Sequence, residues 1–343
     1  MRNAKRQVRQ DAKKAKSEIL SSWRSWRLGA LGGCIFFLMG AAPATTQSVR
    51  FHLTVAADGS EEYKTIQSAI DAVSVHQTQP TIIHIKPGTY REQVRMASNL
   101  TDVILEGEDA ATTIITNNVS ANQLGPDGQK LGTFKTATVY IDGDDCSATN
   151  ITFENSAGNV GQALALSISG DRVQLTNCKL QGWQDTLYVA KGRQYFRDCT
   201  IDGHTDFIFG AATTVFDHCE IHCTQASYIT APSTPPDQRF GFVFLKCKLT
   251  GGEKTFLGRP WRDYGASAFI ECEMGEFIRP QGWDNWRNPA KEKTARFSEY
   301  KSTGPGGDPA QRVPWSRQLT DDEATKYTIE NIFAGSSPWN PSK

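Results

Sequence analysis

Two aspartates, two glutamines and an arginine recur along this sequence at intervals that could bring them together. Asp185 and Asp206 lie 21 residues apart. Gln162 lies 22 residues before Gln184, the residue that precedes Asp185, and Arg259 follows later in the chain. Two nearby carboxylates titrate at different pH values, so one can stay ionised while its neighbour keeps a proton. A carboxylate nucleophile, a carboxylic acid, amide donors for an oxyanion and a cation that keeps the nucleophile charged are the groups that ester hydrolysis needs.

A structural role is the alternative for each of these side chains. Polar residues on turns often only satisfy backbone amides, and for any single aspartate or glutamine that role has the stronger support. The combined set favours catalysis. The motifs G-x-S-x-G and H-E-x-x-H, the phosphate-binding P-loop and a G-x-G-x-x-G turn after a strand do not occur. The usual serine hydrolase, metalloprotease and nucleotide-binding interpretations therefore lack their main sequence signals.

A repeated four-residue pattern indicates how these residues are positioned. In each copy, polar residues alternate with an inward pair two apart, which is the periodicity of a β-strand, and a turn signal often follows. The second residues of the copies are spaced by 27, 21, 20, 28 and 25, and they are Ile151, Cys178, Cys199, Cys219, Cys247 and Cys272. Short strands at such irregular periods, with no helix in each unit, favour a parallel β-helix over a helical solenoid or a propeller. In that fold equivalent positions stack, so we expect the six residues to form one internal column.

The cysteines are expected to fill the core of this solenoid. A zinc site is the alternative, but the close pair Cys219 and Cys223 lacks a second pair at zinc-finger spacing, so we predict no metal. An exported chain would meet an oxidising environment. Cys199 and Cys219 are our best candidates for a disulfide, because strands of adjacent coils lie about 4.8 Å apart, within the Cα range that a disulfide tolerates.

Two helical patterns could close the open ends of the solenoid. Ser60 precedes apolar residues at helical spacing from Tyr63 to Val73, which predicts a capping helix at the N-terminal end. Thr320 and Glu323 form a capping-box pattern before residues 324–333, which predicts a second helix at the other end. Both helices are expected to be structural.

The N-terminal 44 residues have the pattern of a signal peptide. Nine Lys or Arg residues and two acidic residues in the first 27 precede a charge-free stretch, and Ala42-Pro43-Ala44 resembles a cleavage site. An uncleaved membrane anchor is the alternative, but the stretch 28–42 is shorter than the roughly 20 residues that span a bilayer. We therefore predict export, no stable membrane span, and a single domain over residues 45–343. That body carries a net charge of −7, so it offers no basic surface for nucleic acid.

The motifs together resemble those of the pectin methylesterases (pectinesterases) of the carbohydrate esterase type. The matches, in family order, are residues 88–92, 162–166, 184–188, 206–210 and 257–261. The last three are specific, whereas the first alone would be weak. Leu164 stands where the family usually has Val, and His204-Thr205 precedes Asp206 where small or β-branched residues are common, but neither change removes a functional group. The resemblance implies an all-β, right-handed parallel β-helix of the pectin-lyase-like kind, with short capping helices.

The resemblance also implies a role for each residue of the row. Asp206 would attack the ester carbonyl, while Asp185 would protonate the departing methanol and then activate water. Gln162 and Gln184 would donate hydrogen bonds to the oxyanion. Arg259 would orient Asp206 and keep it charged.

Aromatic side chains near the row would bind the sugar. Trp261 would stack on a sugar ring, and Trp183 and Phe209 could extend this aromatic floor, although an aromatic residue beside a turn of the solenoid is as often part of the core. Tyr90 and Glu92 are expected to fix an early coil. No metal and no cofactor is implied.

The implied substrate is methyl-esterified pectin, acted on by a monomeric enzyme that is secreted or held in the cell envelope, in the periplasm or at the outer surface. A pectin-cleaving lyase or glycosidase is one alternative, because fold alone does not determine function. A lyase would require an acidic cluster that binds calcium. A glycosidase would require two or three carboxylates around one bond and would have no role for paired glutamines. A non-catalytic carbohydrate-binding solenoid is the other alternative, which the presence of Asp185, Asp206 and Arg259 disfavours.

Overall fold

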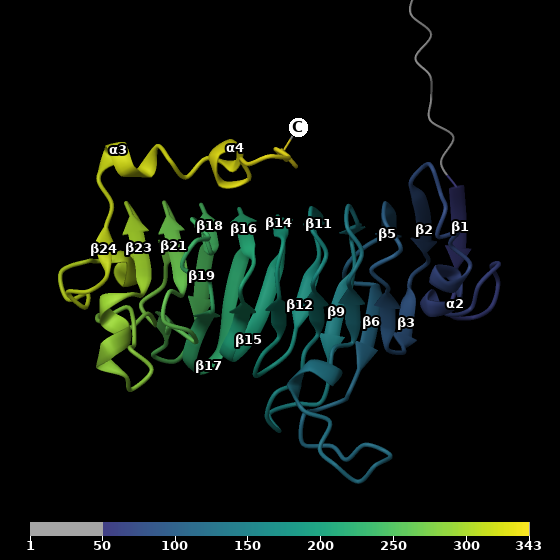
Figure 1. The fold of residues 1–343 in the computed structure, drawn as a ribbon. Helices are drawn as coiled ribbons and strands as arrows, with labels where there is room; N and C mark the ends of the chain where they lie inside the picture. The colour runs from purple at the N-terminus through teal and green to yellow at the C-terminus, as the bar shows by residue number, and fades with distance from the viewer. Residues whose placement is uncertain (1–50, 343) are drawn as a thin grey trace, which may run out of the picture. The chain divides into compact units, whose positions relative to one another are not determined.

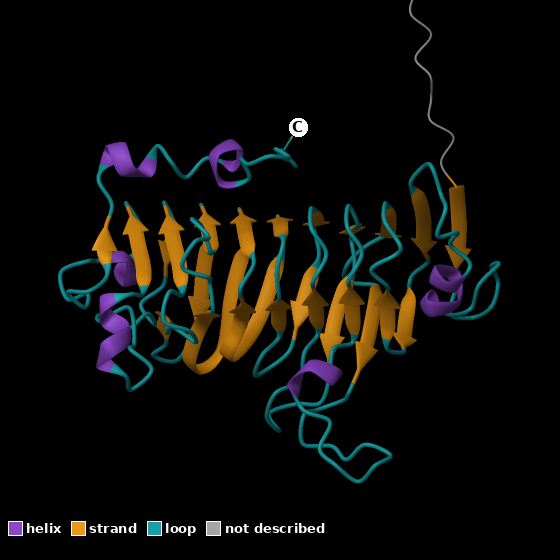
Figure 2. Cartoon of the chain, viewed as in Figure 1, coloured by secondary structure: helices purple, strands orange, loops and turns teal. Residues whose placement is uncertain are grey.

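The computed structural model describes residues 51–342, which belong to one compact unit and wind into a long coil of short strands (Figure 1). The predicted signal peptide, and the anchor that is its alternative, lie outside these residues. Figure 2 shows that strands and loops make up most of the coil and that its helices are short. No helix within residues 51–342 is long and apolar enough to cross a membrane.

One face of the coil is a parallel sheet of eleven strands, one from each successive turn of the chain. In their order across the sheet they are β1 (Phe51–Val55), β2 (Thr81–Ile85), β5 (Val103–Gly107), β8 (Ser147–Thr149), β11 (Val173–Thr176), β14 (Arg193–Arg197), β16 (Thr213–Asp217), β18 (Phe242–Leu245), β21 (Ala266–Ile270), β23 (Arg296–Tyr300) and β24 (Arg317–Gln318). Strand order follows chain order, which is the arrangement of a solenoid.

Thirteen further strands form a second parallel sheet that bends into two faces. One face contains β3 (Gly88–Arg91), β6 (Thr113–Asn117), β9 (Thr152–Asn155), β12 (Lys179–Gln181), β19 (Lys248–Gly251) and β22 (Glu273–Met274). The other contains β4 (Val94–Met96), β7 (Val139–Ile141), β10 (Leu166–Ile168), β13 (Leu187–Val189) and β20 (Phe256–Gly258). The long strands β15 (Thr200–Gly210) and β17 (Glu220–Pro232) belong to both faces, since β15 pairs with β12 through its first residues and with β13 through its last. The chain is therefore a right-handed parallel β-helix, as the sequence predicts.

The internal column of six residues is confirmed. The register aligns Cys178 with Ile151 before it and with Cys199 after it, and the series continues to Cys272, all buried. The residue before each member has a left-handed backbone: Asn150, Asn177, Asp198, His218, Lys246 and Glu271, with φ between 51° and 58°. This conformation turns each coil from the first sheet into the second and fixes the spacing of the column.

The predicted disulfide between Cys199 and Cys219 is wrong: all seven cysteines of residues 51–342 are free. The thiol of Cys199 instead lies within hydrogen-bond distance of the Leu175 and Arg197 carbonyls. Side chains stacked in register on parallel strands point the same way, so their Cβ atoms stay about 4.8 Å apart, beyond the roughly 3.5–4.5 Å that a disulfide needs. The cysteines therefore act as core residues, next to a stack of aromatic rings that includes Phe216, Phe244 and Phe269.

The N-terminal end is covered by α2 (Ile66–Asp71), which is shorter than the sequence predicts. Its N-cap is Thr65, which accepts a hydrogen bond from the Ser68 amide, whereas the Ser60 amide bonds to Asp58. The helix buries its apolar face against β1, β2 and β4, so it does close this end of the solenoid.

The C-terminal segment differs more from its prediction. The capping box of Thr320 and Glu323 is present, but the helix ends early, and two short helices, α3 (Asp321–Ala324) and α4 (Ile329–Ile332), replace the single one expected. This segment, residues 319–339, does not plug the end: it runs back along the outside of the first sheet (Figure 1), and we refer to it as the C-terminal strap. Three 3-10 helices complete the structure: η1 (Thr133–Lys135), η2 (Pro289–Lys293) and η3 (Pro305–Gly307).

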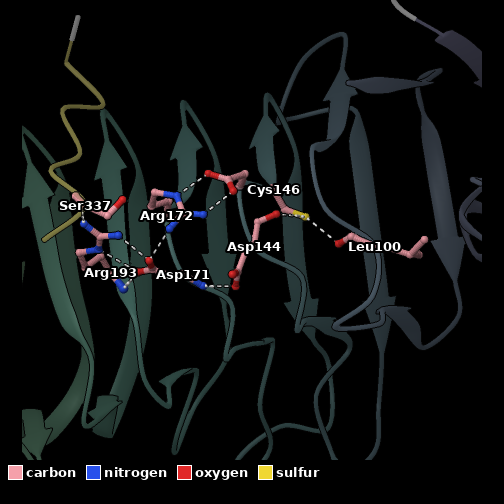
Figure 3. A network of polar contacts seen from close by, with 8 residues as sticks. Leu100, Asp144, Cys146, Asp171, Arg172, Arg193 and Ser337 are labelled. Atoms are coloured by element: carbon pink, nitrogen blue, oxygen red, sulfur yellow. Dashed lines mark hydrogen bonds and ion pairs between the residues drawn. The ribbon is translucent and has the colours of Figure 1, made fainter. Parts of the chain in front are cut away.

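An apolar stripe on the outer face of the first sheet explains the path of the strap. Each of four successive coils contributes one aligned residue to it, namely Tyr195, Val215, Val243 and Ala268. Ile332 and Phe333 of the strap pack on this stripe. Near its end, the Ser337 carbonyl accepts a 2.6 Å hydrogen bond from Arg193, which also pairs with Asp171 (Figure 3).

Candidate active site

The two aspartates occupy equivalent positions in adjacent coils, as the 21-residue spacing predicts. Leu187 pairs with Ile208, so Asp185 and Asp206 stand opposite each other just before that pair. Their backbones are left-handed, with φ of 64° and 50°. Such conformations are uncommon outside glycine but are tolerated by Asp, whose short polar side chain can bond locally.

A β-bulge shapes the backbone at Asp206. The register between β15 and β17 shifts between Thr205 and Ile208, so that Asp206 and Phe207 together oppose the single residue Ile229. Bulges break the regular alternation of side chains and re-aim them, and they are common beside active sites. The bulge lets Phe207 stay buried in the core while Asp206 lines the surface pocket.

Arg259 donates two hydrogen bonds to the Asp206 carboxylate. Its Nε donates to Oδ1 at 2.9 Å and its Nη2 to Oδ2 at 2.7 Å, a bidentate geometry. The two side chains are 20% and 10% exposed, so this pair is screened little by solvent. The pair fixes the position of the carboxylate and favours its ionised form.

The surroundings of Asp185 and Asp206 act differently on the pKa values of the two carboxyl groups. Burial, reinforced by the charge of Asp206, raises the pKa of Asp185 to about 8. Burial also raises the pKa of Asp206, but the hydrogen bonds and the charge of Arg259 oppose that shift. At neutral pH Asp185 therefore keeps its proton, while Arg259 favours an ionised Asp206, which is the division expected of an acid and a nucleophile.

Both predicted glutamines lie at the same pocket. Gln162 and Gln184 pair as an isolated parallel bridge between adjacent coils. Their side chains line a pocket of about 300 Å³ together with Asp185, Asp206 and Arg259. Within residues 51–342 neither side-chain amide has a hydrogen-bond partner, so both can donate to a bound group.

Two of the three predicted aromatic residues lie at the catalytic pocket, and the third lies at a neighbouring one. Trp261 and Phe209 line the catalytic pocket, with ring centroids 5.8 Å apart. Trp183 does not line it: its ring packs edge-on against His204 at 5.7 Å, beside a neighbouring pocket that includes Glu154 and Asp202. Although Trp183 directly precedes Gln184, the corner between the two faces of the second sheet directs its side chain elsewhere.

Several residues of the pocket were missed by the sequence interpretation. Thr133 and Phe134 come from η1, Ala231 from β17, and Trp286 from the loop after the last matched motif. These residues lie outside the repeated pattern. For Phe134 and Trp286 the sequence offers only one signal, an aromatic residue between the repeated motifs, and for Thr133 and Ala231 it offers none.

Tyr90 and Glu92 have the structural roles expected of them. The Tyr90 hydroxyl donates to the Lys86 carbonyl at 2.7 Å. The Glu92 carboxylate accepts hydrogen bonds from the Ile66 and Gln67 amides at 2.9 and 3.0 Å, which caps the start of α2.

Among residues 51–342 there is no group of three or more His, Cys, Asp or Glu residues that could hold a metal ion.

Comparisons with known proteins agree on one family. The family model described as pectinesterase matches residues 52–336. Pectinesterase 31 from Arabidopsis thaliana is 42% identical over 293 residues, covering 83% of this chain and 91% of that protein. A pectinesterase from Petunia integrifolia is 39% identical, covering 83% of this chain and 80% of that protein.

The solved structures that resemble this chain are also pectin methylesterases. The pectin methylesterase from carrot superposes with a TM-score of 0.77 at 33% identity, covering 82% of this chain and 92% of that chain. The pectin methylesterase PemA from Erwinia chrysanthemi gives 0.74 at 30% identity, covering 86% and 100%. A pectin methylesterase in complex with a hexasaccharide gives the same three values of score, identity and coverage of this chain.

Proposed function

This chain belongs to the pectinesterase family, and from that premise we propose that it hydrolyses the methyl esters of pectin with Asp206 as the nucleophile. The reaction yields methanol and a free carboxylate on the polysaccharide. The observation that carries the residue assignment is the pair of hydrogen bonds from Arg259 to Asp206, one coil from the buried carboxyl group of Asp185. Burial raises the pKa of Asp185 to about 8, which favours its protonated form at neutral pH. An ionised and a protonated carboxyl group in one pocket can divide nucleophilic and acid catalysis between them.

The first half of the reaction transfers the acyl group to the enzyme. A carboxylate oxygen of Asp206 attacks the ester carbonyl, and the resulting oxyanion accepts hydrogen bonds from the free amides of Gln162 and Gln184. Collapse of this tetrahedral intermediate breaks the bond to the methoxy oxygen, which takes the proton of Asp185 and leaves as methanol. The products of this half are an anhydride between Asp206 and the galacturonate carbonyl, and an ionised Asp185.

The second half restores the enzyme. Asp185, now a carboxylate, accepts a proton from a water molecule as that water attacks the anhydride carbonyl. The same two amides stabilise the second oxyanion. Collapse of this second intermediate breaks the bond to Asp206, which is left ionised beside Arg259, while Asp185 stays protonated. The released sugar carboxylic acid gives its remaining proton to solvent and becomes the free carboxylate.

The aromatic walls suit a sugar polymer. The faces of Trp261 and Phe209 can pack against the apolar faces of sugar rings, while the polar row meets the ester. One of the structural relatives is a pectin methylesterase in complex with a hexasaccharide, which supports an oligosaccharide as the ligand of this pocket. The substrate is an extracellular polysaccharide, so the proposal also includes export through the predicted signal peptide, and a monomer that acts alone.

Methanol release from highly methylated pectin tests this function. We expect purified protein to release methanol without added metal and in the presence of a chelator, and the Asp206→Asn variant to release none above background. Shortened, unsaturated chains without methanol would instead indicate a lyase, and shortened, saturated chains a glycosidase. Binding to pectin without any product would favour the non-catalytic alternative.

A further inference from the structure

The guanidinium group of Arg259 lies between two aromatic rings. Its Cζ atom is 3.8 Å from the ring centroid of Tyr228 and 3.9 Å from that of Trp286. Two rings so near one carbon cannot occupy the same face of a planar group without overlapping. The guanidinium is therefore held on both faces while its edge makes the two hydrogen bonds to Asp206.

Tyr228 is itself firmly placed. It aligns with Thr205, the residue before Asp206, in the preceding coil, and with Phe256 in the following one. Its ring stacks on that of Phe256, with an interplanar angle of 9° and centroids 5.5 Å apart. The plane of the Tyr228 ring, and with it the plane of Arg259, is thus set by the ladder of the solenoid.

The two rings differ in one respect that matters for function. Trp286 lines the catalytic pocket, where a substrate would touch it. Tyr228 does not line that pocket. Its contact with Arg259 is therefore the route by which we expect Tyr228 to affect catalysis.

A bidentate pair demands alignment. Arginine has a long, flexible side chain, and both hydrogen bonds form only when its plane matches that of the carboxylate. A ring stacked on the guanidinium removes rotational freedom and adds cation–π attraction. A single hydrogen bond in place of two would leave Asp206 free to rotate and less well stabilised as an anion.

We infer that Tyr228 is a positioning residue, which holds the Arg259 guanidinium in the plane that keeps Asp206 oriented for attack. This inference rests on the proposed function, because it assigns a role in the ester hydrolysis for which Asp206 is the nucleophile. It adds a residue outside the catalytic pocket to the machinery of the reaction.

The acid side of the pH–rate profile reports on this role. The charged groups around the pair are Asp185 in the preceding coil, Asp284, and Lys291, which binds the Pro260 and Trp261 carbonyls. None of them changes in a Tyr228 variant. If Arg259 is held less well, it stabilises the Asp206 carboxylate less, the pKa of Asp206 rises, and activity is lost at a higher pH as the solution is acidified.

Tyr228→Leu, compared with Tyr228→Phe, tests the inference. We expect Y228L to lower kcat about 5- to 30-fold, the loss that corresponds to one well-formed cation–π contact. We expect the acid limb of its kcat/KM profile to move up by about 0.7 to 1.5 pH units, the same contact energy expressed as a pKa shift. Y228F keeps the ring and should keep both values near those of the wild type. KM should change by less than about twofold in both variants, since neither alters the pocket wall.

The controls separate this inference from a general loss of structure. Phe240→Leu removes another ring that lies under an arginine, Arg239, at 4.8 Å and away from the catalytic pocket, and it should leave kcat and the profile unchanged. If Y228L does not fold, Tyr228→Met provides the same measurement with a flexible side chain. A Y228L or Y228M profile that superimposes on that of the wild type would overturn the inference, whatever the change in kcat. It would also be overturned if Y228F were as impaired as Y228L.

The same assays distinguish failure of the inference from failure of the proposed function. Wild-type protein that releases no methanol from pectin would overturn the function itself. Active wild-type protein with unaffected Tyr228 variants would overturn only the role of Tyr228. A double-mutant cycle with Arg259→Lys adds a third readout, because Lys cannot present a planar fork, and Y228L should then cost little further activity.

Discussion

Asp185 and Asp206 stand opposite each other in successive coils, both with a left-handed backbone, at φ of 64° and 50°. This is an uncommon arrangement for residues other than glycine, and it costs energy that the rest of the ladder must offset. Among non-glycine residues, Asp and Asn tolerate it best. The choice of substitution at these positions therefore decides whether a variant reports on chemistry or on backbone strain.

Asp206→Asn and Asp206→Ala should lose activity alike but differ in stability. Both remove the nucleophile, so we expect kcat to fall by a factor on the order of 10⁴. Asn tolerates the left-handed backbone, whereas Ala does not, so D206A should be less stable than D206N by about 1–2 kcal/mol. Urea unfolding at pH 7 measures the difference. Equal stabilities would show that the backbone at Asp206 relaxes freely.

Asp185→Asn should remove a pH dependence of stability. The folded chain holds the Asp185 proton up to about pH 8, whereas an unfolded Asp loses it near pH 3.9. The stabilisation from this proton is therefore full below about pH 4 and is lost as the pH rises through about 8, at up to ~1.4 kcal/mol per pH unit. We expect the unfolding free energy of D185N to fall less between pH 5 and pH 8 than that of the wild type. Parallel curves would contradict the raised pKa.

The repeat in the sequence was enough to predict the path of the chain and the row of catalytic candidates. The left-handed residue before each of Cys178, Cys199 and Cys219 repeats once per coil, so the spacing of the column translates directly into stacking. Gln162, Gln184 and the two aspartates follow the same periodicity, and the structure brings them to one pocket. Periodic features could be predicted because one geometry applies to every turn.

Features that break the repeat could not be predicted in this way. The position of Trp286 depends on a loop, and that of Tyr228 on three extra residues between Cys223 and Tyr228 in β17. The direction of Trp183 depends on the corner that precedes Gln184. The disulfide was predicted from the distance between strands, but the direction of the side chains forbids it.

Replacing either oxyanion glutamine with leucine should lower kcat. Gln162→Leu and Gln184→Leu each remove one amide donor, and leucine has a volume similar to that of glutamine. We therefore expect kcat to fall about 10²- to 10³-fold with little change in KM. Gln181→Leu is a matched control, because Gln181 lies on β12 beside the neighbouring pocket. Steady-state methanol release measures all three. A change in KM alone would indicate that the amides bind the ground state and not the oxyanion.

Trp261→Ala and Trp183→Ala should differ in their effect on substrate binding. Trp261 lines the catalytic pocket, so its loss should raise KM by about 5- to 100-fold, the equivalent of about 1–3 kcal/mol of stacking and apolar contact. Trp183 faces the neighbouring pocket and packs on His204, so W183A should leave KM nearly unchanged and lower the midpoint of thermal unfolding. The reverse pattern would place the sugar on the Trp183 side of the corner.

Phe333→Ala should weaken the whole solenoid without affecting the reaction. Phe333 is fully buried between the strap and the outer apolar stripe, and its ring lies 4.8 Å from that of Trp339. Removing a buried phenylalanine typically costs about 3–5 kcal/mol. We expect urea unfolding to show a loss of this size. Because the stripe lies on the first sheet and the catalytic residues on the second, methanol release by folded F333A at 20 °C should match that of the wild type.

Trp339→Ala, at the edge of the same cluster, should cost less, since Trp339 is only partly buried. If F333A unfolds like the wild type, the strap is not a stabilising element, and the stripe must be covered in some other way.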